Sequence, residues 1–140
     1  MKINIKTNLK GYFPVQRALF LLTKMNLTSS ELFYYLFFAS QADFDKRHER
    51  FGVIIRDDRE LAESLGCNEI TVYRKRKTLI KKGFLYEEGG LTKITNMLPF
   101  QLSYAKKLAG FSPTKLQYIL TKRTDEVAEL LEKITEMQTL

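Results

Sequence analysis

The densest group of side chains able to do chemistry lies between Asn68 and Gly83. Against the single acid Glu69, this stretch carries six basic residues: Arg74, Lys75, Arg76, Lys77, Lys81 and Lys82. Each phosphate that such residues neutralise releases condensed counterions, which favours binding to a polyanion. The whole chain is also basic, with 23 Lys and Arg against 16 Asp and Glu and a formal net charge of +7. The charge pattern therefore indicates nucleic acid or an anionic membrane as the partner.

Other reactive side chains lack the neighbours that catalysis or metal binding needs. His48 lies in a charged loop with Asp43, Asp45 and Glu49, and one imidazole in such a loop predicts a solvated residue. The only cysteine, Cys67, has no second thiol or adjacent histidine, so we expect a small space-filling residue in a reducing, cytoplasmic compartment. Without an activated nucleophile, a glycine-rich phosphate loop or a ligand cluster, the sequence predicts no enzyme, no cofactor and no metal site.

A membrane location is not expected. The most apolar stretches, 18–22 and 32–39, are much shorter than the roughly 20 residues that span a bilayer. Residues 1–6 alternate apolar and polar side chains, which predicts a short strand and no secretion signal. A basic surface lying on anionic lipid would need an exposed apolar face that this sequence does not offer.

The basic stretch is framed by signals for two helices and a hairpin. Residues 57–60 resemble a capping box, and a short helix should follow at 61–65 and end at Gly66. After a tight turn, Asn68 can cap a second helix over 69–82 that ends at Gly83. Strands at 84–88 and 91–95 flank Gly89-Gly90, where tolerance of positive φ predicts a two-residue turn.

Helical periodicity separates a buried side of 69–82 from an exposed one. At about 100° per residue, Val72 and Leu79 share a stripe with Ile80 beside it, which should pack on the preceding helix and the hairpin. Arg76 lies about 40° from Val72, so we expect its guanidinium to extend outward to a phosphate or to Glu63. The opposite, outward arc holds Ile70, Thr71, Arg74, Lys77, Thr78 and Lys81.

This order of elements presents the second helix to the major groove of DNA. We assign base-edge contacts to Asn68, Thr71 and Arg74, because a guanidinium suits guanine and a short polar or methyl-bearing group suits adenine or thymine. Lysines are better suited to phosphates, which position the protein without specifying sequence. The predicted DNA-binding residues are Asn68, Ile70, Thr71, Arg74, Lys75, Lys77, Thr78, Lys81 and Lys93.

Sequence signals outside this region predict further elements. A helix should begin at Pro14 and reach about Met25, and a capping box at 28–31 should start a helix over 29–42. This second helix is apolar nearly all the way round, so the first helix, the C-terminal region or a second subunit must cover its other side. Residues 51–55 read as a short strand.

The region after Pro99 predicts helices at 100–108, at 113–120 after Ser112, and at 125–137. The last of these has an apolar stripe made by Val127, Leu130, Leu131, Ile134 and Met137. The sequence leaves open whether this stripe packs on its own domain or forms a homodimer interface. A dimer would suit two DNA half-sites about one helical turn apart.

Several short motifs lie along 51–85: Phe51-Gly52-Val53-Ile54-Ile55, Arg59-Glu60-Leu61-Ala62, Leu65-Gly66, Thr71-Val72-Tyr73-Arg74, Leu79 and Lys82-Gly83-Phe84-Leu85. Together they resemble the winged helix-turn-helix domains of plasmid and phage replication initiators and replisome organisers. The run Gly11-Tyr12-Phe13-Pro14-Val15 is similar to the segment that precedes the domain in those proteins. The resemblance covers about 11–95 and implies double-stranded DNA as the partner.

The expected fold is therefore mainly α with a small β-hairpin wing, a winged helix-turn-helix with additional N- and C-terminal helices. One domain should span 1–140, with its core at 11–95 and a helical extension at 97–140. The leading hypothesis is a sequence-specific DNA-binding protein of a mobile element, acting in replication initiation or transcription control. The alternative is an accessory DNA-binding or protein-docking component of a plasmid transfer complex, since the same domain serves all these processes.

Overall fold

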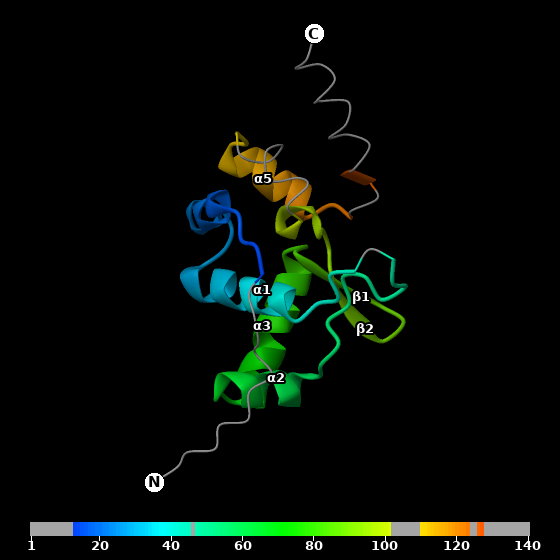
Figure 1. Cartoon of the computed structure of the whole chain (residues 1–140). Coiled ribbons are helices and arrows are strands. Elements are labelled where there is room, and N and C mark those ends of the chain that lie inside the picture. The colour runs from blue at the N-terminus through cyan, green and yellow to red at the C-terminus, as the bar shows by residue number, and fades with distance from the viewer. Residues whose placement is uncertain (1–12, 46, 102–109, 124–125, 128–140) are drawn as a thin grey trace.

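The computed structural model describes residues 13–45, 47–101, 110–123 and 126–127. Within these ranges the protein is helix-rich and has one two-stranded antiparallel hairpin, as expected (Figure 1). In chain order the elements are η1 (Arg17–Lys24), α1 (Ser29–Ser40), α2 (Asp58–Leu65), α3 (Glu69–Lys81), β1 (Leu85–Glu88), β2 (Leu91–Ile94), η2 (Leu98–Phe100) and α5 (Pro113–Leu120). None of the helices in these ranges is long and apolar enough to cross a membrane.

Local capping signals account for the starts of the principal helices. Thr28 and Glu31 form the predicted capping box of α1, with the Thr28 hydroxyl accepting from the Glu31 amide and the Glu31 carboxylate accepting from the Thr28 amide. The Asp57 side chain accepts from the third residue of α2, and Gly66 ends that helix with φ 66°. Asn68 caps α3 by accepting from the Ile70 amide at 2.9 Å. The caps at Thr28 and Asn68 are confirmed, and Asp57 also caps its helix, but α2 begins at Asp58 and not at Leu61 as predicted.

The first predicted helix differs from expectation in type and start. It is a 3-10 helix, η1, that begins at Arg17, and Pro14 lies before it in irregular backbone. Three residues per turn place Leu19 and Leu22 directly above one another, and both are fully buried. No side chain caps its start, so packing of these two leucines, and not a local capping signal, sets where the helix begins.

The hairpin forms where it was predicted, with Leu85 opposite Ile94 and Glu88 opposite Leu91. Both turn glycines have positive φ, 59° for Gly89 and 78° for Gly90, as a two-residue turn of this kind requires. The predicted strand at 51–55 is wrong: this segment makes only isolated bridges, including one from Val53 to Lys93. Gly52 has φ 83°, which breaks the extended backbone a strand would need.

Helix α1 lies at the centre of the apolar core. Tyr35 and Phe38 are fully buried, and the Tyr35 ring lies 5.3 Å from that of Phe84 and 5.7 Å from that of Phe100. In Figure 1, η1 and α5 lie above α1, whereas α3 crosses it and carries α2 at its far end. The same core includes Leu116 and Leu120 of α5. The second side of α1 is therefore covered by its own chain, through η1 and the region after Pro99.

The described part of the C-terminal region confirms one predicted helix. Ser112 caps α5 by accepting from the Lys115 amide, as its sequence indicates. Val127 is buried against Leu98 and Ile119, so this member of the terminal stripe packs on its own chain. The remaining stripe residues, most of the predicted helix at 100–108 and the opening strand at 1–6 lie outside the described residues.

Candidate nucleic-acid interface

Helix α3 is anchored along one side and uncovered along the other. Val72 and Leu79 are fully buried where α3 packs against α2, α1 and β1, which confirms the predicted stripe. On the opposite side Ile70 is 55% exposed, and Arg74, Lys77 and Lys81 are also exposed. Thr71 and Thr78 on this side are half-buried, so the exposed part of the arc is made by Ile70 and the three cations.

The cations of α3 differ in whether their side chains are already paired within the protein. Within the described ranges, the side chains of Arg74 and Lys81 make no hydrogen bond or ion pair. Lys77 donates to Glu87 on the hairpin at 3.2 Å. Lys75 is half-buried, with its ammonium 6.0 Å from the ring centroid of Tyr34 on α1. Among the described cations of α3, Arg74 and Lys81 are therefore the most available to a binding partner.

The polar residues assigned to base contacts are held at the start of α3. The Asn68 side-chain oxygen accepts the capping bond, and the amide NH2 of this exposed residue is its donor group for a ligand. Thr71 is half-exposed one turn from Arg74. The Thr78 hydroxyl donates to the Arg74 carbonyl at 3.0 Å, so its proton is used within the helix.

Arg76 has a structural role that its sequence position did not reveal. Its Nε and Nη2 donate to the two oxygens of Asp58 at 3.0 and 2.9 Å, and its Nη1 donates to Glu87 at 2.7 Å. The expectation that it reaches a phosphate or Glu63 is wrong, and Glu63 pairs with Arg59 instead. Its place beside Val72 brings it to the seam between α2 and the hairpin. Hydrogen bonding to Asp58 raises the pKa of Arg76 further, so the charge is permanent.

Lys82, like Arg76, pairs with groups of its own chain. Its ammonium donates to both Glu31 oxygens, at 2.7 and 3.0 Å, and to the Asn26 carbonyl at 2.6 Å. Burial alone would raise the pKa of Glu31, but hydrogen bonds from Lys82 and the Thr28 amide outweigh it and lower the pKa. This cluster ties the end of α3 to the start of α1.

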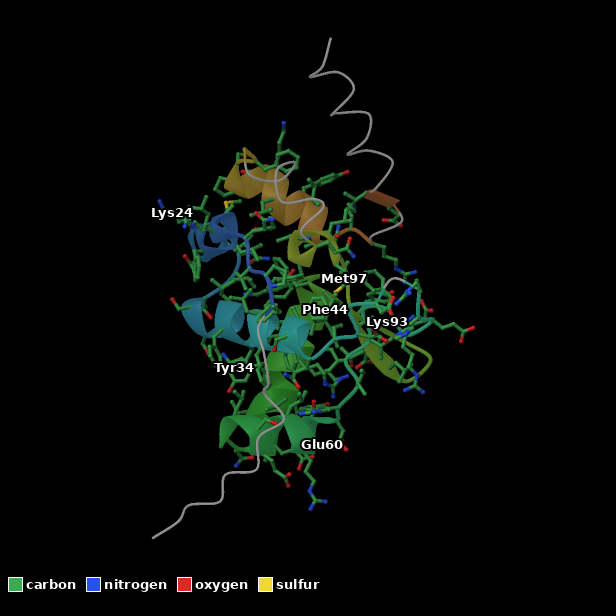
Figure 2. The ribbon with its side chains drawn as sticks, viewed as in Figure 1. Lys24, Tyr34, Phe44, Glu60, Lys93 and Met97 are labelled. Atoms are coloured by element: carbon green, nitrogen blue, oxygen red, sulfur yellow. The ribbon has the colours of Figure 1, made fainter. Side chains whose placement is uncertain are left out.

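The hairpin is more acidic than a DNA-facing surface would suggest. Lys93, assigned to a phosphate, has a side chain only 20% exposed and lies 3.4 Å from Glu88 (Figure 2). Arg123, which sequence reasoning did not single out, lies 3.7 Å from Glu88 and stacks over Tyr86 at 4.4 Å. The adjacent basic residues Lys122 and Arg123 after α5 were the sequence feature that could have indicated a cation here. Hydrogen bonding from Lys77, aided by Arg76, lowers the pKa of Glu87, so this carboxylate is ionised near neutral pH.

The titratable side chains of two further polar features are engaged in ion pairs. A cleft of about 380 Å³ separates the start of α2 from the hairpin, but its Asp58 and Glu87 are paired with Arg76. In the loop after α1, His48 contacts Asp43 at 3.0 Å and Asp45 at 3.2 Å. Across the part of the chain described, no group of three or more His, Cys, Asp or Glu residues could hold a metal ion.

Comparisons with protein-family models, with curated proteins and with solved structures find no match to this chain. Function is therefore inferred from geometry and charge. Helix α3 has a buried apolar side and an exposed side that carries Arg74 and Lys81.

Proposed function

We propose that this chain binds double-stranded DNA sequence-specifically, with α3 lying in the major groove and the hairpin acting as the wing of a winged helix-turn-helix. The major groove is about 12 Å wide and admits an α-helix. The observation that carries the proposal is the exposed cationic side of α3, with Arg74, Lys77 and Lys81, opposite fully buried Val72 and Leu79. The chain as a whole has a net charge of +7, which adds long-range attraction to a polyanion.

The residues divide into two roles. Arg74, with Asn68 and Thr71 beside it, reads base edges, because its guanidinium is exposed and unpaired among the described residues. Lys81, and more weakly Lys77, contacts phosphates. Lys75, Thr78 and Lys93 contribute less than their sequence positions suggested, since their polar groups lie against the protein's own atoms.

The biological setting that we infer is a mobile element, with the protein acting in replication initiation or transcription control and catalysing no reaction itself. Its proposed activity would be exercised in the cytoplasm. The C-terminal stripe at Leu130, Leu131, Ile134 and Met137 is proposed as a homodimer interface that would pair two half-sites. The biological setting rests on the resemblance of the motifs at 51–85 to replication initiators and replisome organisers, and the dimer rests on the apolar spacing of the terminal stripe.

A salt-dependent binding titration tests the central claim. A duplex selected from a random pool is compared with random duplex by fluorescence anisotropy between about 50 and 200 mM salt. Arg74→Ala should weaken binding to the selected duplex by about 1–3 kcal/mol and reduce the preference for that duplex over random duplex. Lys81→Ala should weaken binding to both duplexes alike and lower the slope of log affinity against log salt concentration, the salt slope, by about one.

Lys115→Ala supplies the matched control. Lys115 is exposed on α5, at the other end of the molecule from α2 (Figure 1), so its loss should leave preference and slope near wild type. Equal loss on all sequences in Arg74→Ala would reassign that residue to a phosphate. If the wild type binds no duplex even at about 50 mM salt, the proposal is wrong and the protein-docking role in a plasmid transfer complex is favoured.

A further inference from the structure

The exposed surface of α3 carries two large apolar side chains as well as cations. Ile70 is 55% exposed in the first turn, and Tyr73 is 47% exposed one turn later. Single exposed apolar residues are common and call for no explanation by themselves. Here Ile70 shares the outward arc with Arg74 and Lys77, where a solvated helix would ordinarily carry polar side chains.

Both side chains are held in place. Ile70 is β-branched, so its χ1 angle is restricted in a helix, and its amide is tied to Asn68 at 2.9 Å. The Tyr73 ring lies 5.3 Å from the Arg76 guanidinium and 5.6 Å from the Lys77 ammonium. Because Arg76 is itself fixed by Asp58, the ring has a rigid neighbour. Ile70 precedes Tyr73 by three residues and Arg74 by four on α3, so the three side chains are neighbours on the helix surface.

On the major-groove edges of the bases, thymine alone offers an apolar group, its 5-methyl. We propose that Ile70, with Tyr73 beside it, recognises the 5-methyl group of a thymine next to the base that Arg74 contacts. This inference rests on the proposed DNA binding and adds the class of base that the site prefers. Cytosine at that position would leave the isoleucine without an apolar contact, so the target should contain thymine there.

Deoxyuridine provides a direct test, because it differs from thymidine only by the missing methyl group. The duplex selected by the wild type is resynthesised with deoxyuridine at each thymidine in turn, and affinities are measured by anisotropy. One buried methyl group predicts about a fourfold loss of affinity at one position for the wild type. Ile70→Ala should bind the thymidine and deoxyuridine duplexes at that position equally well.

Ile55→Ala is the matched control, since Ile55 is 60% exposed but lies before α2 and not on α3. It should keep the fourfold difference of the wild type. Because Ile70 is exposed, Ile70→Ala should retain the wild-type circular dichroism spectrum and unfolding midpoint, which separates a lost contact from a lost fold.

Each outcome is decisive. If the wild type binds every deoxyuridine duplex as tightly as the parent, the methyl contact is wrong while DNA binding stands. If Ile70→Ala keeps the fourfold difference, another residue reads the methyl and the assignment is overturned. If the wild type binds no duplex at all, the proposed function fails and this inference fails with it.

Discussion

Replacing Lys82 by methionine should destabilise the fold far more than the same change at the adjacent Lys81. The Lys82 ammonium contacts Glu31 and the Asn26 carbonyl, and the two charged side chains are 24% and 8% exposed. Removing one partner of a buried ion pair costs about 3–5 kcal/mol, because the remaining charge is left unpaired. Since Lys82 is partly exposed, we take the lower end, about 3 kcal/mol.

The free energy of unfolding is measured by urea unfolding followed by far-ultraviolet circular dichroism. In a thermal scan, a loss of about 3 kcal/mol corresponds to a fall of about 10 °C in the thermal midpoint for a domain of this size. Lys81→Met should stay within about 0.5 kcal/mol of the wild type, since the Lys81 side chain is exposed and unpaired in the described ranges. The double variant Lys82→Met with Glu31→Gln should recover about 1–2 kcal/mol, because no unpaired charge remains.

The pH dependence gives a second readout of the same contact. The pKa of Glu31 is lowered in the folded protein, so its contribution is present above the ordinary carboxyl pKa and is lost as pH falls through the folded value. Lys82→Met should therefore reduce the loss of stability on acidification.

In DNA binding, Lys81→Met should have the larger effect of the two variants. Lys81→Met should lower the salt slope, whereas Lys82→Met should leave it unchanged at a temperature well below its thermal midpoint. Equal stability of the two variants would refute the assignment of Lys82 to the Glu31 cluster.

Three further results are expected. Arg76→Met should lower the free energy of unfolding by about 3 kcal/mol, because the half-buried Asp58 carboxylate loses its partner, whereas Glu87 keeps Lys77; a change below about 1 kcal/mol in urea unfolding would contradict this. Glu87→Gln should free Lys77 and raise both DNA affinity and the salt slope, by about one in a titration; an unchanged slope would show that Lys77 does not reach a phosphate. The pKa of His48 is raised by hydrogen bonding to Asp43, so proton NMR should find it above the ordinary value and Asp43→Asn should lower it. Any stability that His48 adds is present at low pH and lost as pH rises through its folded pKa.

Much of the local structure follows from the sequence alone. The caps at Thr28, Asp57 and Asn68 and the Gly89-Gly90 turn were predicted correctly, because each depends on contacts within a few residues. The buried side of α3 was also predicted correctly, since helical periodicity determines which side chains share a face.

Tertiary contacts decided which of the cations can meet a ligand. Lys81 and Lys82 are adjacent in sequence, yet only Lys82 meets Glu31, which lies 51 residues away. Arg76 is paired with Asp58 and the hairpin in the same way. The type of η1 also depended on packing, because no local cap sets its start. Ion pairing and burial join residues distant in the chain, so local patterns locate the charged helix, and only the folded arrangement shows which of its charges remain free.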